Sequence, residues 1–143
     1  DLMAMLPFCG YNMGDYVGHW IEMGRRMTAP PKIFHVNWFR LDDEGKFMWP
    51  GFGENLRVLE WILGRCKGTA PAIETPIGHV PTPDAINLDG LDFTPEDMEP
   101  LLSVDRDEWR EEADQITEFF KKFGDDLPTE VRTELNALVG RLG

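Results

Sequence analysis

Apolar residues recur at spacings of three and four over several stretches of the chain, and this pattern predicts amphipathic helices. The first stretch covers residues 14–27, with Val17, Trp20 and Met27 on one side. The TAPP run at 28–31 ends it, because proline cannot continue a helix. A second helix is expected from residue 54, and Gly64 and Gly68 weaken its end. Its apolar stripe consists of Leu56, Leu59, Leu63 and Cys66.

The last third of the chain predicts more helices. Thr94 has the character of an N-cap, and Pro95 after it suits the first helical position. A long helix opens at Asp105 and stops at Gly124, and Pro128 starts the last helix. We expect these last two helices to form an antiparallel pair that packs on the first half of the chain.

Between the helices, alternating apolar residues predict short strands. Phe34, Val36 and Trp38 fall on one face of residues 33–39, a DDEG turn follows at 42–45, and residues 46–49 return as the second strand of a hairpin. Residues 75–80 form a further candidate strand, and residues 88–93 are expected to be loop. The predicted fold class is therefore α/β, a mixed α+β segment of short strands with outer helices.

Charge divides the chain into two halves. The formal net charge of −12 belongs wholly to residues 69–143, with 18 acids against 6 bases, whereas residues 1–68 carry eight of each. This balance argues against a nucleic-acid or anionic-membrane partner, since both need basic patches. No apolar run approaches the roughly 20 residues of a membrane-spanning helix. Two cysteines make no disulfide framework, so we expect a reducing, cytoplasmic setting.

Aromatic residues gather in the neutral half, with seven between positions 34 and 61. Phe39 precedes the predicted turn at 42–45, Phe47 and Phe52 follow it, and the glycines beside Phe52 permit close backbone approach. One interpretation is that a planar base stacks among these three rings, where stacking contributes ~1–3 kcal/mol. The other is that the rings are hydrophobic core, as Phe34 and Trp38 are expected to be. Spacing alone leaves both interpretations open.

A base-binding site also needs contacts to the edge of the base. Guanine offers an acceptor at O6 and donors at N1 and N2, and the side-chain amide of Asn55 carries both an acceptor and donors. Glu54 or backbone carbonyls are candidates for the remaining N–H groups. Adenine inverts this pattern at the same atoms, so such a site would reject it.

Several runs in one order resemble a known family, the GTP-dependent phosphoenolpyruvate carboxykinases, in their C-terminal region. The resemblance extends over essentially all 143 residues. The runs that carry it are PFCGYN at 7–12, GDY at 14–16, HW at 19–20, PKIFHVNWFR at 31–40, FMWPGFGEN at 47–55, RVLEW at 57–61, ETPIG at 74–78 and the acidic helical tail.

The resemblance implies a lyase of gluconeogenesis that converts oxaloacetate and GTP to phosphoenolpyruvate, carbon dioxide and GDP, with manganese and with magnesium on the nucleotide. It implies that the rings matching Phe39, Phe47 and Phe52 enclose guanine and that the residue matching Asn55 reads its edge. The run Phe52-Gly53-Glu54-Asn55 is then the nucleotide-binding signature. Residues 1–68 would be the aromatic guanine-binding segment of the C-terminal nucleotide-binding lobe, and residues 69–143 the acidic, mostly helical remainder of the same domain.

Other chemistry-bearing residues have structural interpretations. His19, His35 and His79 lie far apart in sequence and are better explained as structural than as metal ligands. Cys9 is a reactive thiol or, as we prefer, a small buried residue. Arg25 and Arg26 suit either a phosphate or the carboxyl end of a helix.

The sequence contains no phosphate-cradling GxxxxGK[ST] loop and no plausible metal-ligand set. In the family these parts lie upstream, so we expect a C-terminal piece that needs the N-terminal remainder of the enzyme and is inactive alone. As an isolated piece it would expose the face that meets that remainder. The alternative is a non-catalytic interaction domain whose acidic helical tail binds a basic partner and whose aromatic hairpin is only core.

Overall fold

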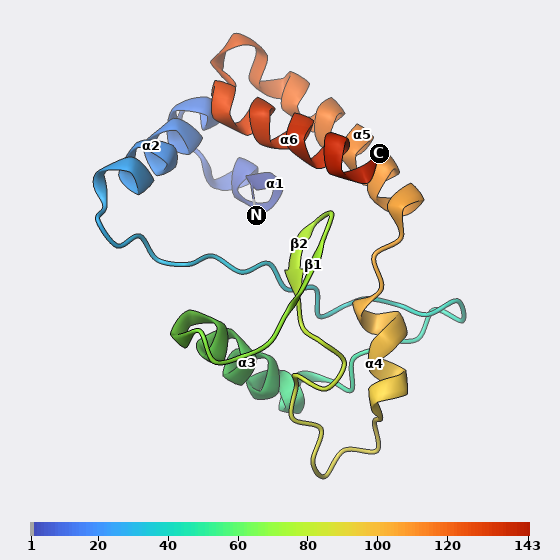
Figure 1. Cartoon of the computed structure of the whole chain (residues 1–143). Coiled ribbons are helices and arrows are strands. Elements are labelled where there is room, and N and C mark those ends of the chain that lie inside the picture. The colour runs from blue at the N-terminus through green and yellow to red at the C-terminus, as the bar shows by residue number, and fades with distance from the viewer. Residues whose placement is uncertain (1) are drawn as a thin grey trace. The chain divides into compact units, whose positions relative to one another are not determined.

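The computed structural model describes residues 2–143, and these fall into two compact units (Figure 1). One, the helical unit, combines residues 2–31 with Asp105–Gly143. The other, the aromatic unit, is the continuous segment Lys32–Val104. The predicted division into residues 1–68 and 69–143 rests on composition and function, and it stays a prediction.

The helical unit contains helices from both ends of the chain. Its elements are α1 (Leu2–Met5), the 3₁₀ turn η1 (Leu6–Phe8), α2 (Met13–Arg26), α5 (Arg106–Phe120), the 3₁₀ segment η3 (Lys121–Asp126) and α6 (Thr129–Leu142). The predicted helices over 14–27, from Asp105 and from Pro128 are therefore confirmed. Their common core consists of Met13, Val17, Phe119, Phe123 and Leu127.

Helix α2 begins at a side-chain cap that also holds the η3 segment. The amide oxygen of Asn12 accepts a hydrogen bond from the Gly14 N–H at 2.7 Å. The amide Nδ2 of Asn12 donates to the Asp126 carboxylate at 2.5 Å. The cap thus satisfies one of the unpaired N–H groups at the start of the helix and connects residues that lie 114 positions apart.

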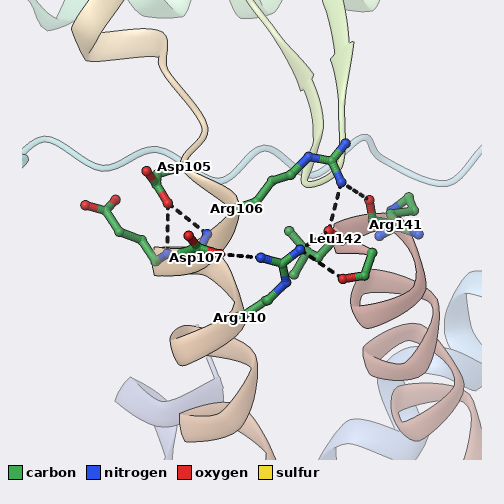
Figure 2. Close-up of polar contacts among 8 residues, drawn as sticks. Asp105, Arg106, Asp107, Arg110, Arg141 and Leu142 are labelled. Carbon is green, nitrogen blue, oxygen red and sulfur yellow. Dashed lines mark hydrogen bonds and ion pairs between the residues drawn. The ribbon is translucent and has the colours of Figure 1, made fainter.

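Helices α5 and α6 form the expected antiparallel pair, and charged side chains fasten their adjoining ends (Figure 2). Arg106 donates to the carbonyls of Arg141 and Leu142 at 3.0 and 2.8 Å. Arg110 donates to the Leu142 and Gly143 carbonyls at 2.8 and 2.9 Å. The last carbonyls of a helix lack partners within it and carry partial negative charge, so two guanidinium groups are well placed there.

The start of α5 has its own cap. The Asp105 carboxylate accepts from the N–H groups of Asp107 and Glu108 at 2.8 and 3.1 Å, as Figure 2 shows. These two bonds lower the pKa of Asp105 from its ordinary value of 3.8, and the bond from the Glu108 N–H has the larger effect. The prediction that Asp105 opens this helix is confirmed. The α-helix itself ends at Phe120, and the 3₁₀ segment that continues it is broken at Gly124, the predicted stop, which has φ +56°.

The aromatic unit is mostly loop, with short regular elements around one core. They are the 3₁₀ turn η2 (Phe52–Glu54), α3 (Asn55–Lys67), β1 (Ile73–Thr75), β2 (Gly78–Val80) and α4 (Pro95–Leu102). The strands β1 and β2 are antiparallel, with Ile73 opposite Val80. Thr94 caps α4 in a capping box with Asp97, as its sequence predicts, and residues 88–93 are loop.

The predicted strand over residues 33–39 is wrong. Its alternation is real, since Phe34, Val36 and Trp38 are half-buried and the residues between them are exposed. The described residues contain no neighbouring strand that pairs with it, so the segment is extended but belongs to no sheet. The returning strand at 46–49 reduces to one bridge between Leu41 and Phe47 around the predicted turn. The single strand expected over 75–80 is instead the last residue of β1, the turn and the whole of β2.

Helix α3 is present as predicted and ends at Gly68 in the left-handed conformation. The face that it buries differs from the expected stripe. Leu56, Leu59, Leu63 and Cys66 are all exposed. The neighbouring face packs on the core of the unit instead, through Val58, Trp61 and Ile62. That core is completed by Trp49, Ile86 and Met98, with Phe34, Trp38 and Phe93 beside it.

The fold class is confirmed as mixed α and β, with helices predominating and one small antiparallel hairpin in the described residues.

Candidate functional site

The predicted site residues lie on one stretch of the aromatic unit, from the turn around Asp42 to the start of α3. The turn is closed by Asp42, whose carboxylate accepts from the N–H groups of Glu44 and Lys46 at 3.0 and 2.8 Å. The Met48 N–H donates to the Arg40 carbonyl at 2.9 Å. These bonds bring the two sides of the turn together and set Phe39 near Phe47.

Arg40 fixes this turn to the carboxyl end of α4. Its guanidinium donates to the carbonyls of Leu101 and Ser103, both at 2.9 Å, and to the Ser103 hydroxyl at 3.0 Å. Three bonds from one planar group hold the base of the turn in one orientation. The sequence offered no signal for this role, because the partners lie more than 60 positions away.

Phe39 and Phe47 form a pair at the surface of the unit. Their ring centroids lie 6.1 Å apart with an interplanar angle of 59°. Their side chains are 70% and 60% exposed, and Phe52 is 91% exposed. The interpretation of these three rings as core is therefore wrong, whereas for Phe34 and Trp38 it is confirmed. The structure pairs Phe39 with Phe47, and Phe52 has no ring partner within residues 2–143.

Phe52 and the glycines on either side of it form the entry to α3. Gly51 has φ +128°, a conformation that side chains rarely adopt, and its carbonyl accepts from the Glu54 N–H at 3.1 Å. A Cβ added to Gly53 would meet no atom within 4 Å. The backbone at Gly53 thus stands open beside a fully accessible phenyl ring.

Asn55 is the first residue of α3 and is half-buried. Its side-chain oxygen accepts a hydrogen bond from the indole N–H of Trp49 at 2.9 Å. Its own backbone N–H donates to the Phe52 carbonyl. The side chain and the backbone of Asn55 are therefore both held, and they are held by residues of the same loop.

Glu54 is paired within the unit. Its carboxylate lies 2.7 Å from Nε of Arg57, and both side chains are mostly covered. Arg57 also donates to the carbonyls of Asn87 and Asp89 at 2.8 and 3.0 Å. Glu54 thus connects the start of α3 to the loop at 87–89 through Arg57, a role that its position in sequence does not indicate.

A separate hollow of about 480 Å³ lies along the exposed side of α3. None of the six predicted site residues lines it. Its walls are Leu56, Leu59, Glu60, Leu63, Gly64, Lys67 and Thr69. The predicted apolar stripe of α3 therefore borders an accessible groove.

The remaining chemistry-bearing residues of the described part of the chain form no metal-binding group. Within residues 2–143 no group of three or more His, Cys, Asp or Glu side chains is placed to hold a metal ion. Cys9 is half-buried against the helical core, and Cys66 is exposed. Arg25 pairs with Glu130, and Arg26 lies 2.7 Å from Glu22. Both arginines are thus engaged by carboxylates.

No helix in the part of the chain that the structure describes has the length and apolar character needed to cross a membrane.

Comparison with known proteins gives a consistent result. Residues 1–141 match the family described as phosphoenolpyruvate carboxykinase C-terminal P-loop domain. The chain is 51% identical over its whole length to the phosphoenolpyruvate carboxykinase [GTP] of Paenarthrobacter aurescens (strain TC1). It is 50% identical to the protein of that name from Renibacterium salmoninarum and 48% identical to that from Thermoplasma volcanium.

In each of these three alignments the chain covers 24% of the relative, so it spans about a quarter of the length of the curated relatives that it matches. The family match covers nearly every residue of the chain, and the overall identity to each of these three relatives is close to one half. This chain belongs to the phosphoenolpyruvate carboxykinase C-terminal P-loop domain family.

Proposed function

We propose that this chain is the C-terminal, guanine-recognising portion of a GTP-dependent phosphoenolpyruvate carboxykinase, a lyase that converts oxaloacetate and GTP to phosphoenolpyruvate, carbon dioxide and GDP. The observation that carries the proposal is the group of exposed rings, Phe39, Phe47 and Phe52, on the loop that ends at the fixed amide of Asn55. Adjoining exposed rings, such as the Phe39–Phe47 pair, form an apolar patch of the kind that a ligand or partner covers. The names of the relatives include GTP, and for this reason we take the ligand to be a guanine nucleotide.

The three rings bind the faces of the base. Phe39 and Phe47 are inclined to each other and leave ring surface open to solvent. A purine that stacks on such rings removes apolar area from water. Stacking of this kind contributes ~1–3 kcal/mol per base and does not depend on which base is bound. The rings therefore supply affinity without selectivity.

Selectivity comes from the edge of the base. The amide of Asn55 follows Phe52 by one helical turn, so both side chains lie towards the same side of the chain. An amide can donate to the O6 acceptor of guanine. Gly53 permits the backbone to approach the base closely, because nothing stands within 4 Å of its α-carbon substituent position. Glu54 supports this site through Arg57 rather than by standing free.

The phosphates and metals of the reaction belong to another part of the enzyme. The chain has no GxxxxGK[ST] run, and its described residues do not fit a metal site, so no step of catalysis is assigned to them. The proposal places the phosphate loop, the manganese and magnesium ligands and the oxaloacetate site in the N-terminal remainder of the same enzyme. It also includes the cytoplasmic setting and the role in gluconeogenesis that the resemblance implies.

The apolar side of α3 is our proposed contact with that remainder. Leu56, Leu59 and Leu63 are exposed along a groove of about 480 Å³. The relatives are about four times as long as this chain, so they contain the surface needed to cover such a face. Residues 1–68 are then the guanine-binding segment of the lobe, and residues 69–143 are its acidic, mostly helical remainder. The acidic interaction domain is not favoured, because the aromatic loop is not core.

The test is nucleotide binding by the full-length protein that carries this chain, measured by calorimetry with GDP, IDP and ADP. We expect GDP and IDP to bind and ADP to bind at least about tenfold more weakly, the ratio that one hydrogen bond of ~1.4 kcal/mol supplies. Asn55→Ala should weaken GDP and abolish this difference. Equal binding of GDP and ADP by the unaltered protein would contradict the proposal.

A further inference from the structure

The hydrogen bond between Trp49 and Asn55 joins a core residue to the proposed base-reading residue. Trp49 is only 6% exposed and belongs to the core of the aromatic unit. Its ring lies 6.3 Å from that of Phe93 and 6.5 Å from that of Trp38, centroid to centroid. The indole is thus fixed by packing, and its N–H has a definite direction in space.

The chemistry of the indole decides which way the amide of Asn55 points. An indole N–H is a donor and never an acceptor. Its partner at 2.9 Å must therefore be the amide oxygen of Asn55, not the amide nitrogen. A rotation of the amide by 180° would bring NH₂ against N–H and leave a buried donor unpaired, which is unfavourable. Trp49 accordingly holds the oxygen inward and leaves the NH₂ group as the part available to a ligand.

We propose that Trp49 is a positioning residue that sets the base selectivity of this site, by locking the Asn55 amide as a hydrogen-bond donor. The inference rests on the proposed function. A locked donor suits the O6 acceptor of guanine or hypoxanthine and opposes the amino group that adenine carries at the same position. An amide free to rotate would serve either purine, because it would present its oxygen to the amino group.

The backbone of Asn55 is also held in place, and this further restricts the orientation of its side chain. The Asn55 N–H donates to the Phe52 carbonyl, and the residue begins α3. Glu54, directly before it, is held through Arg57 to the loop at 87–89. With its backbone fixed on both sides, Asn55 keeps only the freedom of its side chain, and the hydrogen bond from the Trp49 N–H restricts the orientation of the amide.

The test compares Trp49→Phe with Trp38→Phe in the full-length protein, by calorimetry with GDP, IDP and ADP. Trp49→Phe keeps an aromatic ring in the core and removes the N–H. We expect GDP and IDP to weaken by about twofold, because the amide must then select one of two orientations. ADP should bind more tightly, so that the ratio of GDP to ADP affinity falls by about tenfold. Trp38→Phe makes the same chemical change beside Trp49 without touching Asn55 and should leave the ratio unchanged.

A second variant tests the polarity directly. In Asn55→Asp one carboxylate oxygen can still accept from Trp49, and the group facing the base becomes an acceptor. We expect the preference to shift from GDP towards ADP. If Trp49→Phe only loosened the fold, all three nucleotides would weaken together and ADP would not gain, and this result would overturn the inference. Selectivity for guanine that is intact in Trp49→Phe would overturn it while leaving the proposed function standing. Lack of guanine selectivity in the unaltered protein would instead overturn the proposed function.

Discussion

Gly14 lies so close to Asp126 that a Cβ built on Gly14 would stand 2.3 Å from the carbonyl oxygen of Asp126. The two residues belong to α2 and η3, the segments that the Asn12 cap also joins. Only a glycine permits this approach, because the atom that would have to move is backbone.

The first prediction follows from this contact. Gly14→Ala should destabilise the chain by about 1–3 kcal/mol, the usual cost of an added atom that a packed site cannot accommodate. Urea unfolding followed by far-ultraviolet circular dichroism measures the change. Gly18→Ala is the matched control in the same helix, since its nearest atom lies 4.0 Å from the added Cβ. Because alanine is the better helix former, Gly18→Ala should be neutral or stabilising. An equal loss of unfolding free energy in Gly14→Ala and Gly18→Ala would contradict the prediction.

The second prediction concerns affinity for the base. Phe52→Ala should weaken GDP binding to the full-length protein by ~1–3 kcal/mol, roughly five- to 150-fold in Kd, through loss of stacking. The melting temperature of the Phe52→Ala protein should equal that of the unaltered protein, because the Phe52 side chain is almost wholly exposed. Phe8→Ala removes another exposed ring, one that lies in the helical unit and outside the site. Calorimetry should show no loss of GDP affinity in this control, and a similar loss in both variants would count against the site.

The third prediction concerns the exposed face of α3. The isolated 143-residue chain should self-associate, because Leu56, Leu59 and Leu63 present adjoining apolar surface to water. The double variant Leu59→Ser with Leu63→Ser should shift the chain towards monomer in sedimentation velocity and bind less of an apolar dye. Val139→Ser, at a similarly exposed position on α6, serves as the control and should change neither readout. An isolated chain that is monomeric without any substitution would contradict this expectation.

The fourth prediction is a pH dependence at the start of α5. Hydrogen bonds from the N–H groups of Glu108 and Asp107 lower the pKa of Asp105 below 3.8 in the folded chain. A carboxyl with a lowered folded pKa adds stability above its unfolded pKa and loses it as the pH falls through the folded value. The stability of the chain should therefore decline as the pH falls from about 5 to below 3.8.

Asp105→Asn separates this effect from acid sensitivity in general. Asparagine keeps a cap oxygen but does not titrate in this range. The advantage of the natural residue over Asp105→Asn should be largest near neutral pH and should vanish at low pH. Urea midpoints measured for both chains at pH 7, 5 and 3 provide the check, and a constant difference across the series would refute the assignment.

The elements that the sequence predicted well are those with local causes. Asp105 and Thr94 bond to N–H groups two or three positions away, and Gly68 and Gly124 interrupt the helical path through their own φ angles. Such signals lie within one turn of the residue that carries them, so a single sequence contains the whole of the physical cause.

The predictions that were wrong concern features that depend on residues far away in the sequence. Residues 33–39 alternate correctly between half-buried and exposed, but a strand also needs a hydrogen-bonded neighbour, which alternation cannot supply. The apolar stripe of α3 is equally real, and its side of the helix still faces outward because Trp61 with Val58 and Ile62 occupies the core. Two apolar faces on one helix leave the choice of the inner face to tertiary packing.

For the candidate site, the sequence identified the residues but not the hydrogen bonds and ring contacts that they make. Phe39, Phe47 and Phe52 could be named from composition, but only their exposure separates them from Trp49 and Trp61, which are core. The bond from Trp49 to Asn55 spans six positions across two glycines, a spacing with no regular secondary structure to predict it. The three carbonyl and hydroxyl partners of Arg40 lie still further along the chain.

The discontinuity of the helical unit has a consequence for the order of folding on the ribosome. Its two parts flank residues 32–104, whereas the aromatic unit is one uninterrupted segment. During synthesis from the amino end, every residue of the aromatic unit emerges before α5 does. Helix α2 must therefore wait with Met13 and Val17 uncovered until Phe119, Phe123 and Leu127 arrive to bury them. Joining the two parts also closes a long loop, and its entropic cost falls if the segment between them has already become compact. The nascent chain should accordingly form its aromatic core first and its helical core only once residues 105–143 have been made.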